Sequence, residues 1–149
     1  MIVVDLYNGI FKILANDPTI LSLLDIDTTI DVDALKVAKA EKIQKRRKPQ
    51  NLISNIPLIA FYSPGGNVER NNDLVYCATF VFDVYTNDDI EKAHEIHNRI
   101  SKIFDDCVPS IPTLTTFLTH FEEAYESETD LANTYCFTTI CTFSVGLED

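Results

Sequence analysis

The cysteines of this 149-residue chain lack the spacing that would bind zinc. None of them forms a CxxC pair, and only the last two lie close together in the sequence: Cys77, Cys107, Cys136 and Cys141. A zinc ribbon would need tighter pairing. Three of the four lie in apolar runs typical of strands, where a free thiol behaves as a small hydrophobic side chain. We therefore expect four reduced cysteines and no metal.

Long hydrophobic runs are missing as well. No apolar run approaches the ~18 residues that a helix needs to cross a bilayer. Residues 1–6 have neither the basic stretch nor the small-residue cleavage site of a secretory leader. We therefore expect a soluble protein that is made and kept in a cytosol, with no membrane partner.

Sequence frames that hold nucleotides or catalytic serines are also absent. The sequence contains no GxxxxGKS or GxxxxGKT loop, no GxGxxG and no GxSxG. The Ser-Pro-Gly-Gly run at 63–66 is interpreted as a turn. Paired carboxylates at 88–89 and 122–123 fit a helix start and a strand surface, and nothing indicates the apolar pocket that an acid–base pair needs. We expect no enzyme activity and no cofactor.

Two histidines offer the one pattern that resembles a metal site. His94 and His97 lie three residues apart on a predicted helix, with Glu91 and Glu95 nearby, so imidazole and carboxylate groups could meet around a divalent ion. The spacing is not HExxH. The interpretation we favour places His97 half-buried on the apolar stripe of the helix and His94 in solvent. A small metal-dependent hydrolase is therefore the least favoured function.

Charge is distributed very unevenly. The net charge is −11, yet seven of the twelve basic residues lie within positions 36–48. Because Glu41 is the one acidic residue of that stretch, it carries +6 and the rest of the chain −17. An acidic surface repels phosphate, which disfavours general nucleic-acid binding. An acidic body with one basic arm suits head-to-tail packing between copies.

The first quarter of the chain predicts helices. Apolar residues recur at spacings of three and four, which is the stripe of an amphipathic helix ending near Pro18: Leu6, Ile10, Ile13 and Leu14. Pro18 can itself open a second short helix, giving a helical hairpin. Residues 25–33 alternate apolar and polar side chains and fit either a short edge strand or an extended linker.

Residues 34–47 predict a basic helix. They are strong helix formers, Asp33 is a plausible N-cap, and the basic residues gather toward the C-terminal end, where the helix dipole favours them. The lysines recur every third position and therefore spiral around the helix. Such a helix is poorly suited to burial in its own core.

The middle of the chain predicts a hairpin. Residues 57–62 form an apolar strand closed by a turn at 63–67, and residues 75–86 form the strongest strand of the sequence, rich in β-branched and aromatic residues. The polar stretch 65–73 between them is long for a hairpin tip. We expect it to project from the body.

The second half completes the predicted sheet. Residues 90–104 form an amphipathic helix that covers one face, and 115–126 and 134–147 form two strands joined by an acidic turn. The order of elements predicts an α+β fold, a mainly antiparallel four-stranded sheet with helices packed on one face. A single domain spans residues 1–149.

Parts of this pattern resemble a known family. Residues 5–18, followed by Leu-Ser-Leu-Leu at 21–24, and the strand at 80–86 leading into 93–100, are similar to the tail-completion, or tail-to-head joining, proteins of long-tailed bacteriophages. The resemblance implies a small α+β subunit that closes into a ring, commonly of six copies, at the head-proximal end of the tail tube. It carries no catalytic residues over to this sequence.

The resemblance implies a structural virion protein that caps the tail tube and joins the tail to the head. Its partners would be itself, the tail tube protein and a neck or head-completion protein, in the host cytoplasm during assembly and then in the virion. A neck connector that contacts DNA in its lumen is the alternative. The basic segment, residues 36–48, is not part of the resemblance.

The basic segment leaves three interpretations open: a solvated helix end, an arm that docks on a protein, or a contact to DNA or RNA. No aromatic residues interleave with it, so stacking on single-stranded bases is disfavoured, while phosphate contacts remain possible and are not favoured. Our interface hypothesis combines this segment with the projecting stretch. It comprises Lys42, Lys45, Arg46, Arg47, Lys48, Gly65, Gly66 and Asn67.

Overall fold

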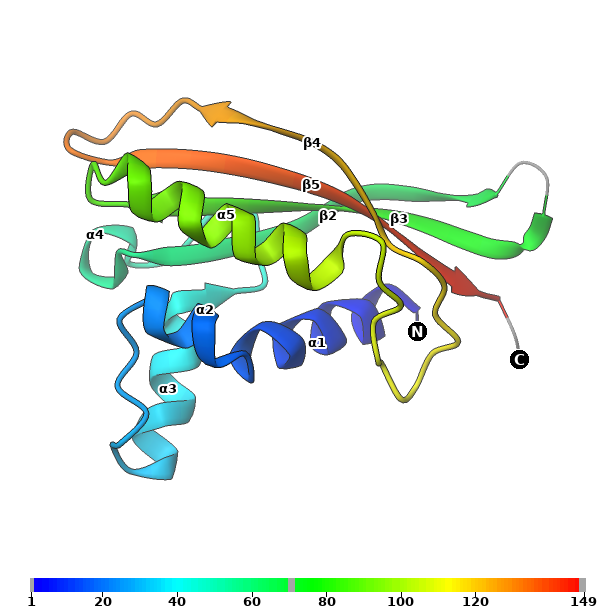
Figure 1. Ribbon diagram of the computed structural model, residues 1–149, viewed down its shortest axis with the longest axis horizontal. Helices are drawn as coiled ribbons and strands as arrows, with labels where there is room; N and C mark the ends of the chain where they lie inside the picture. The colour runs from blue at the N-terminus through cyan, green and yellow to red at the C-terminus, as the bar shows by residue number, and fades with distance from the viewer. Residues whose placement is uncertain (1, 70–71, 148–149) are drawn as a thin grey trace.

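The computed structural model describes residues 2–69 and 72–147, and its centre is one five-stranded sheet in the order β1-β2-β3-β5-β4 (Figure 1). β1 is parallel to β2, and the other neighbours are antiparallel. The strands are β1 (Ile43–Gln44), β2 (Leu58–Glu69), β3 (Asn72–Thr86), β4 (His120–Ser127) and β5 (Tyr135–Gly146). The predicted α+β class is confirmed. The prediction of a four-stranded antiparallel sheet was wrong, because a two-residue parallel strand is too short to leave an alternating pattern.

Three helices cover one face of this sheet (Figure 1). They are α1 (Ile2–Ala15), α2 (Pro18–Leu23) and α5 (Ile90–Phe104), which matches the predicted hairpin and amphipathic helix within a few residues. α3 (Val32–Lys42) stands away from the body, and α4 (Leu52–Asn55) is a single turn near one end of the sheet. Residues 25–33 form no strand, since they turn and then enter α3.

Aromatic side chains hold the helices to the sheet. Phe80 on β3 makes edge contacts with Tyr7 of α1 and Phe143 of β5, with ring centroids 5.1 Å and 5.4 Å away. Phe104 of α5 stacks on Phe82, with the centroids 5.6 Å apart. Such pairs add to the free energy of burying the rings. The helices thus cover the part of this sheet face that carries the aromatic core.

The predicted basic helix ends earlier than its composition indicates. α3 stops at Lys42 because Ile43 is extended, with φ −127° and ψ 95°, and pairs with Ile59 of β2. Ile43 is 1% exposed and belongs to the core. No residue of α3 itself is buried. The prediction of a helix over 34–47 was therefore wrong beyond Lys42, and the helix begins at Val32 rather than after Asp33.

The predicted turn at 63–67 is a bulge inside a strand. β2 continues to Glu69, and its register with β3 shifts between Tyr62 and Gly65 and again after Val68. The two strands stay paired as far as Glu69 and Asn72. The paired ends of β2 and β3 project past the helices as an arm, at the right of Figure 1. The described residues of the predicted stretch, 65–69 and 72–73, project from the body as predicted, but as strands rather than as a loop. Residues 70 and 71 lie outside the described part of the chain.

Candidate assembly interface

The predicted interface cations, Lys42 to Lys48, run from the last residue of α3 past the β1 edge of the sheet, and the first of them is used inside the chain. Lys42 Nζ donates to the carbonyl oxygens of Asn55 and Pro57, each at 3.3 Å. Loss of water around this half-buried ammonium lowers its pKa. Lys42 thus ties the end of α3 to the start of β2.

The next cations contact neutral partners of the same chain. Lys45 Nζ donates to Asn8 Oδ1 at 2.9 Å and lies 5.3 Å from the ring centroid of Phe11. Arg47 lies over the ring of Tyr62, with Cζ 5.5 Å from the centroid. These cation–π contacts are worth little at exposed positions. They hold the segment against the body without neutralising it.

Most of the segment does not fold back onto acidic side chains, although Arg47 lies close enough to Asp83 for its charge to act on that carboxylate. Arg46 and Lys48 are exposed, and within residues 2–69 and 72–147 neither makes an ion pair. The ion pairs found there use other cations, Lys92 with Asp25 and Arg99 with Asp17. The positive charge of this edge therefore remains available to another molecule.

Beside the segment lies a groove of about 830 Å³, which we call the basic groove. It is formed by one side of α3, the end of α1 and the chain after β1. Its apolar part comprises Phe11, Val37, Ala40 and Ile43. Its charged part comprises Lys36, Lys39, Lys45, Arg46 and the single carboxylate Glu41.

Sequence reasoning missed the groove. Lys36 and Lys39 lie in the predicted basic helix and were not included in the interface hypothesis, and Phe11 lies in the predicted first helix. The available signal was Val37 and Ala40, which follow those lysines at helical spacing and give α3 an apolar strip between cations. The sequence does not show that α1 lies next to this apolar strip of α3.

The arm carries the other predicted interface residues. Gly65 has open space where a side chain would begin, Gly66 lies against the ring of Tyr76, and Asn67 is exposed opposite Cys77. β1 pairs with Ile59 and Ala60, at least five residues before Gly65. At about 3.3 Å per residue, the arm glycines lie ~16 Å or more further along β2. Lys42 is therefore distant from the arm glycines, whereas Arg47 lies over Tyr62, three residues before Gly65, so the C-terminal end of the basic segment comes nearer to the arm.

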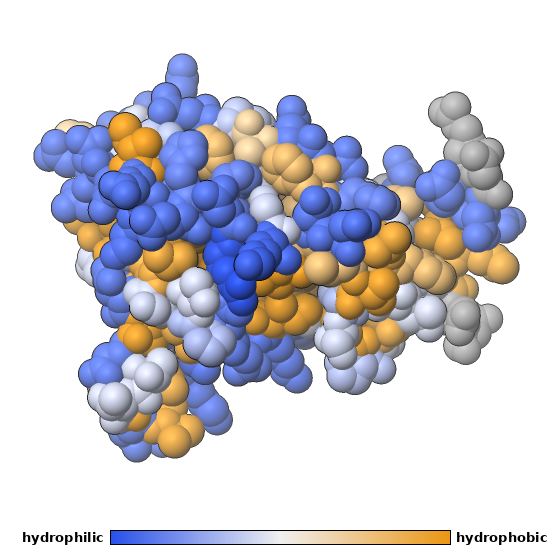
Figure 2. All heavy atoms as spheres, viewed as in Figure 1, coloured by the Kyte–Doolittle hydropathy of each residue, from blue (hydrophilic) through white to orange (hydrophobic). Residues whose placement is uncertain are grey.

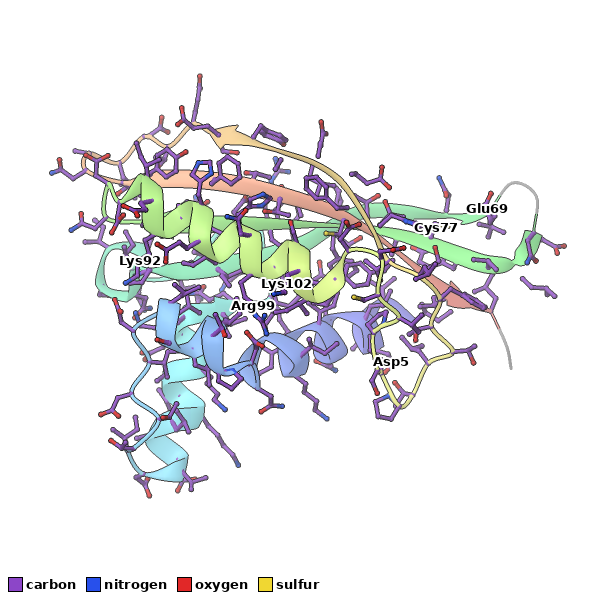
Figure 3. All side chains as sticks on the ribbon, viewed as in Figure 1. Asp5, Glu69, Cys77, Lys92, Arg99 and Lys102 are labelled. Atoms are coloured by element: carbon purple, nitrogen blue, oxygen red, sulfur yellow. The ribbon has the colours of Figure 1, made fainter. Side chains whose placement is uncertain are left out.

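The arm also exposes apolar side chains. Val68 and Leu74, on β2 and β3, are 47% and 65% exposed. Figure 2 shows hydrophobic residues reaching the surface on this part of the molecule. Glu69 and Cys77 lie on the two facing strands, with Cys77 Sγ 3.6 Å from Glu69 Oε2 (Figure 3).

Both histidines contact β5, and their rings also lie edge to face, with the centroids 6.5 Å apart. His97 Nδ1 lies 2.6 Å from Thr139 Oγ1, and His94 Nε2 lies 3.3 Å from the Tyr135 hydroxyl. His94 also packs on Phe137, with the centroids 4.1 Å apart, so its predicted position in solvent was wrong. No group of three or more potential metal ligands forms among the residues that the structure describes.

A polar network occupies the sheet face opposite the helices. Asp83 lies between Phe82 and Val84, both core residues, and therefore points to the other face. Its carboxylate accepts a hydrogen bond from Thr138 Oγ1 at 2.6 Å, and Thr138 also contacts Ser127 Oγ. Burial raises the pKa of Asp83, the largest of the effects on it. The network satisfies a partly buried carboxylate and lacks a nucleophile activated by a base.

Comparison with known proteins gives a match in structure only. No family model matches the sequence, and no curated protein matches it. Among solved structures, a chain of the "virion of native gene transfer agent (GTA) particle" superposes with a TM-score of 0.68. The match covers 95% of this chain and 94% of that chain, at 11% sequence identity. At this identity the likeness establishes a shared fold.

None of the helices within residues 2–69 and 72–147 combines the length and apolar character needed to cross a bilayer.

Proposed function

We propose that this chain is a structural virion protein that caps a phage tail tube as a ring and joins the tail to the head. The observation that carries the proposal is the shared fold with a chain of a gene transfer agent virion, because it extends over nearly the full length of both chains. The sequence resemblance to tail-completion proteins leads independently to the same kind of particle.

The surface fits an assembly role. The basic edge keeps exposed cations, while the arm presents exposed Val68 and Leu74. Oriented charge sets the encounter between subunits, and apolar contacts supply the affinity. A ring needs a contact between two different surfaces of the same chain whose rotation closes. The basic segment and the acidic remainder of the chain supply two different surfaces of opposite charge for such a contact.

A non-catalytic role accords with the chemistry of the described residues. The thiols of Cys136 and Cys141 are buried, which raises the pKa of each to about 12 and disfavours a thiolate nucleophile. The half-buried histidines bind hydroxyl groups of the sheet. Shape and surface charge are then what the chain contributes to the particle.

The test is assembly on tail tubes. Purified protein is mixed with tubes of the cognate particle, and negative-stain images are scored for a ring at one end only. We expect capped tubes of fixed length, whereas tubes made without the protein continue to grow. Normal tube length without the protein would contradict the proposal. Antibody labelling along the whole tube rather than at one end would contradict it as well.

A neck connector that contacts DNA is the second candidate, favoured by the exposed cations Arg46, Arg47 and Lys48. Filter binding to duplex DNA across a range of salt concentrations separates the two. A phosphate-binding arm gives affinity that falls steeply with salt, because bound counterions are released. An Arg46→Glu/Arg47→Glu variant would then lose DNA binding, whereas a tail cap has little DNA affinity to lose.

A further inference from the structure

The basic groove is an apolar surface surrounded by positive charge. Its lining contains four cations and one carboxylate, a net charge of +3. Val37 on its α3 wall is 56% exposed, and no residue of α3 is buried. In Figure 1, α3 leaves the body with only one side against the rest of the chain. An eleven-residue helix of this kind is marginally stable alone, so a partner in the groove would stabilise it.

A complementary surface exists on the same chain, which we call the acidic edge. It is the outer strand β4 between Phe121 and Glu126, and it has three carboxylates and no cation, a net charge of −3. Its members are Phe121, Glu122, Glu123, Ala124, Tyr125 and Glu126. Phe121 and Tyr125 are 37% and 47% exposed, so aromatic rings accompany the charge.

The acidic edge limits what can bind there. β4 has a neighbouring strand on one side only. The Phe121 amide donates to Asp105 Oδ1 at 2.9 Å, and the outer edge of the strand beyond Phe121 faces no other strand of the sheet. Charged side chains on an edge strand disfavour indiscriminate pairing with other strands. A partner must therefore supply cations together with an apolar surface. The basic groove offers both.

The two surfaces cannot meet within one molecule. β1 and β4 are the opposite edges of one sheet, and a row of paired residues crosses it from Gln44 through Ala60, Asp83 and Thr138 to Tyr125. Four spacings of about 4.8 Å separate the ends of this row by ~19 Å. Figure 1 shows β4 along one margin of the molecule and α3 beyond the other. Each copy thus carries both halves of a contact that only two copies can complete.

Resting on the proposed assembly function, we propose that the acidic edge of one copy docks in the basic groove of the next. β4 enters the groove of the neighbour edge-on: Glu123 and Tyr125 lie on the sheet face opposite the helices, and Phe121 and Glu126 lie on the helical face. Each side of the strand therefore brings one carboxylate and one aromatic ring to the groove, and Glu122 lies at the bulge between them. The contact joins two different surfaces and repeats from copy to copy, so it generates a closed ring when the rotation permits. Charge fixes which surfaces meet, and the aromatic rings supply affinity.

Two charge-reversed variants test the contact. Lys39→Glu/Arg46→Glu makes the groove acidic, and Glu122→Lys/Glu123→Lys makes the edge basic. Alone, each variant presents like charges to itself and loses self-association by roughly 100-fold, measured by sedimentation velocity. Lys12→Glu/Lys102→Glu is the matched control. It reverses two exposed lysines that line neither surface and associates like the wild type.

Mixing the two variants gives the sharper result. An acidic edge from the first variant meets the unchanged groove of the second, and the basic edge of the second meets the acidic groove of the first. Equimolar mixing therefore restores assemblies in which the variants alternate, and native mass spectrometry identifies them by mass. Circular dichroism and the melting temperature verify that each variant is folded before mixing.

Three outcomes overturn the contact. The first is a folded variant that, on its own, self-associates as strongly as the wild type. The second is a mixture of the two folded variants that does not restore assembly. The third is a wild type and a mixture that both remain monomeric at their highest soluble concentration. Tube capping is scored separately: reversed variants that still form rings and cap tubes refute the contact and leave the proposed function standing. Rings that depend on the groove but ignore tubes refute the function and leave the contact.

Discussion

Arg99 of α5 binds both carboxylate oxygens of Asp17, with Nε 2.9 Å from Oδ2 and Nη2 2.6 Å from Oδ1. Asp17 is also the N-cap of α2, where its Oδ2 accepts a hydrogen bond from the Ile20 amide at 3.0 Å. One side chain therefore starts α2 and ties the α1–α2 turn to α5 (Figure 3 shows Arg99 on α5). The bidentate geometry fixes the direction of approach as well as the distance.

Replacing Asp17 should destabilise the fold. We expect Asp17→Ala to lower the free energy of unfolding by about 1 kcal/mol from the lost cap alone, with a further loss from the Arg99 contact. Asp17→Asn retains a cap acceptor and should cost less. Asp31→Ala is the matched control, because Asp31 is the N-cap of α3 but makes no side-chain cap bond. Equal losses at Asp17 and Asp31 in urea unfolding would contradict this account.

The same contact predicts a dependence on acid. The hydrogen bond from Arg99 is the largest effect on Asp17 and lowers its pKa in the folded state. Its stabilisation is therefore fully present above the unfolded pKa of about 3.9 and is lost as pH falls through the lower folded pKa. The stability difference between the wild type and Asp17→Asn should shrink as the pH is lowered below 4. A difference that stays constant over that interval would exclude the contact as its source.

Replacement by alanine should destabilise the protein at one of the two arm glycines and not at the other. A Cβ on Gly66 would lie 2.4 Å from the Tyr76 hydroxyl and 2.7 Å from the Cys77 carbonyl oxygen, whereas a Cβ on Gly65 meets nothing within 4 Å. Gly66→Ala must shift backbone and should cost about 1–3 kcal/mol. Gly65→Ala should be neutral or slightly stabilising, since it restricts the unfolded chain. Thermal melts and the rate of arm proteolysis check both, and indistinguishable variants would be contrary evidence.

Local sequence patterns correctly predicted the elements that form whichever segment they pack against. Leu6, Ile10 and Leu14 have helical spacing and are all buried in α1, because any sheet face would accept that stripe. The end of α3 was not predictable in the same way, since Gln44, Lys45 and Arg46 are good helix formers. What stops the helix is the pairing of Ile43 with Ile59, a contact between distant segments.

Contacts between distant segments also explain why the structure of the arm and of the interface differs from the predictions. Pro64-Gly65-Gly66 is a strong local turn signal, yet pairing with β3 converts it into a bulge and extends the strand. The basic groove is assembled from α1, α3 and the chain after β1, so no stretch of sequence contains it. Charge segregation, by contrast, depends only on composition along the chain, and the sequence analysis identified it.

The cysteines should fall into two classes toward thiol reagents. Burial is the largest effect on Cys136 and Cys141 and raises the pKa of each to about 12. Cys77 and Cys107 are half-exposed. We expect a maleimide to label two positions in the native protein near pH 8 and four in urea, because only the thiolate reacts. Intact mass and peptide mapping identify the positions, and early labelling of Cys141 would contradict the buried placement.

The titration of His97 should lower the stability of the folded protein in mild acid. Burial, followed by the charge of His94, lowers the pKa of His97 in the folded state, and Phe121 and Phe137 complete its surroundings. The unfolded chain, with a histidine pKa near 6.5, then binds the proton more readily, so stability falls as pH drops below about 6.5. His97→Gln removes this titration and can still bind Thr139. Urea unfolding between pH 7.5 and 5 should give a flatter profile for the variant, and parallel profiles would place the acid sensitivity elsewhere.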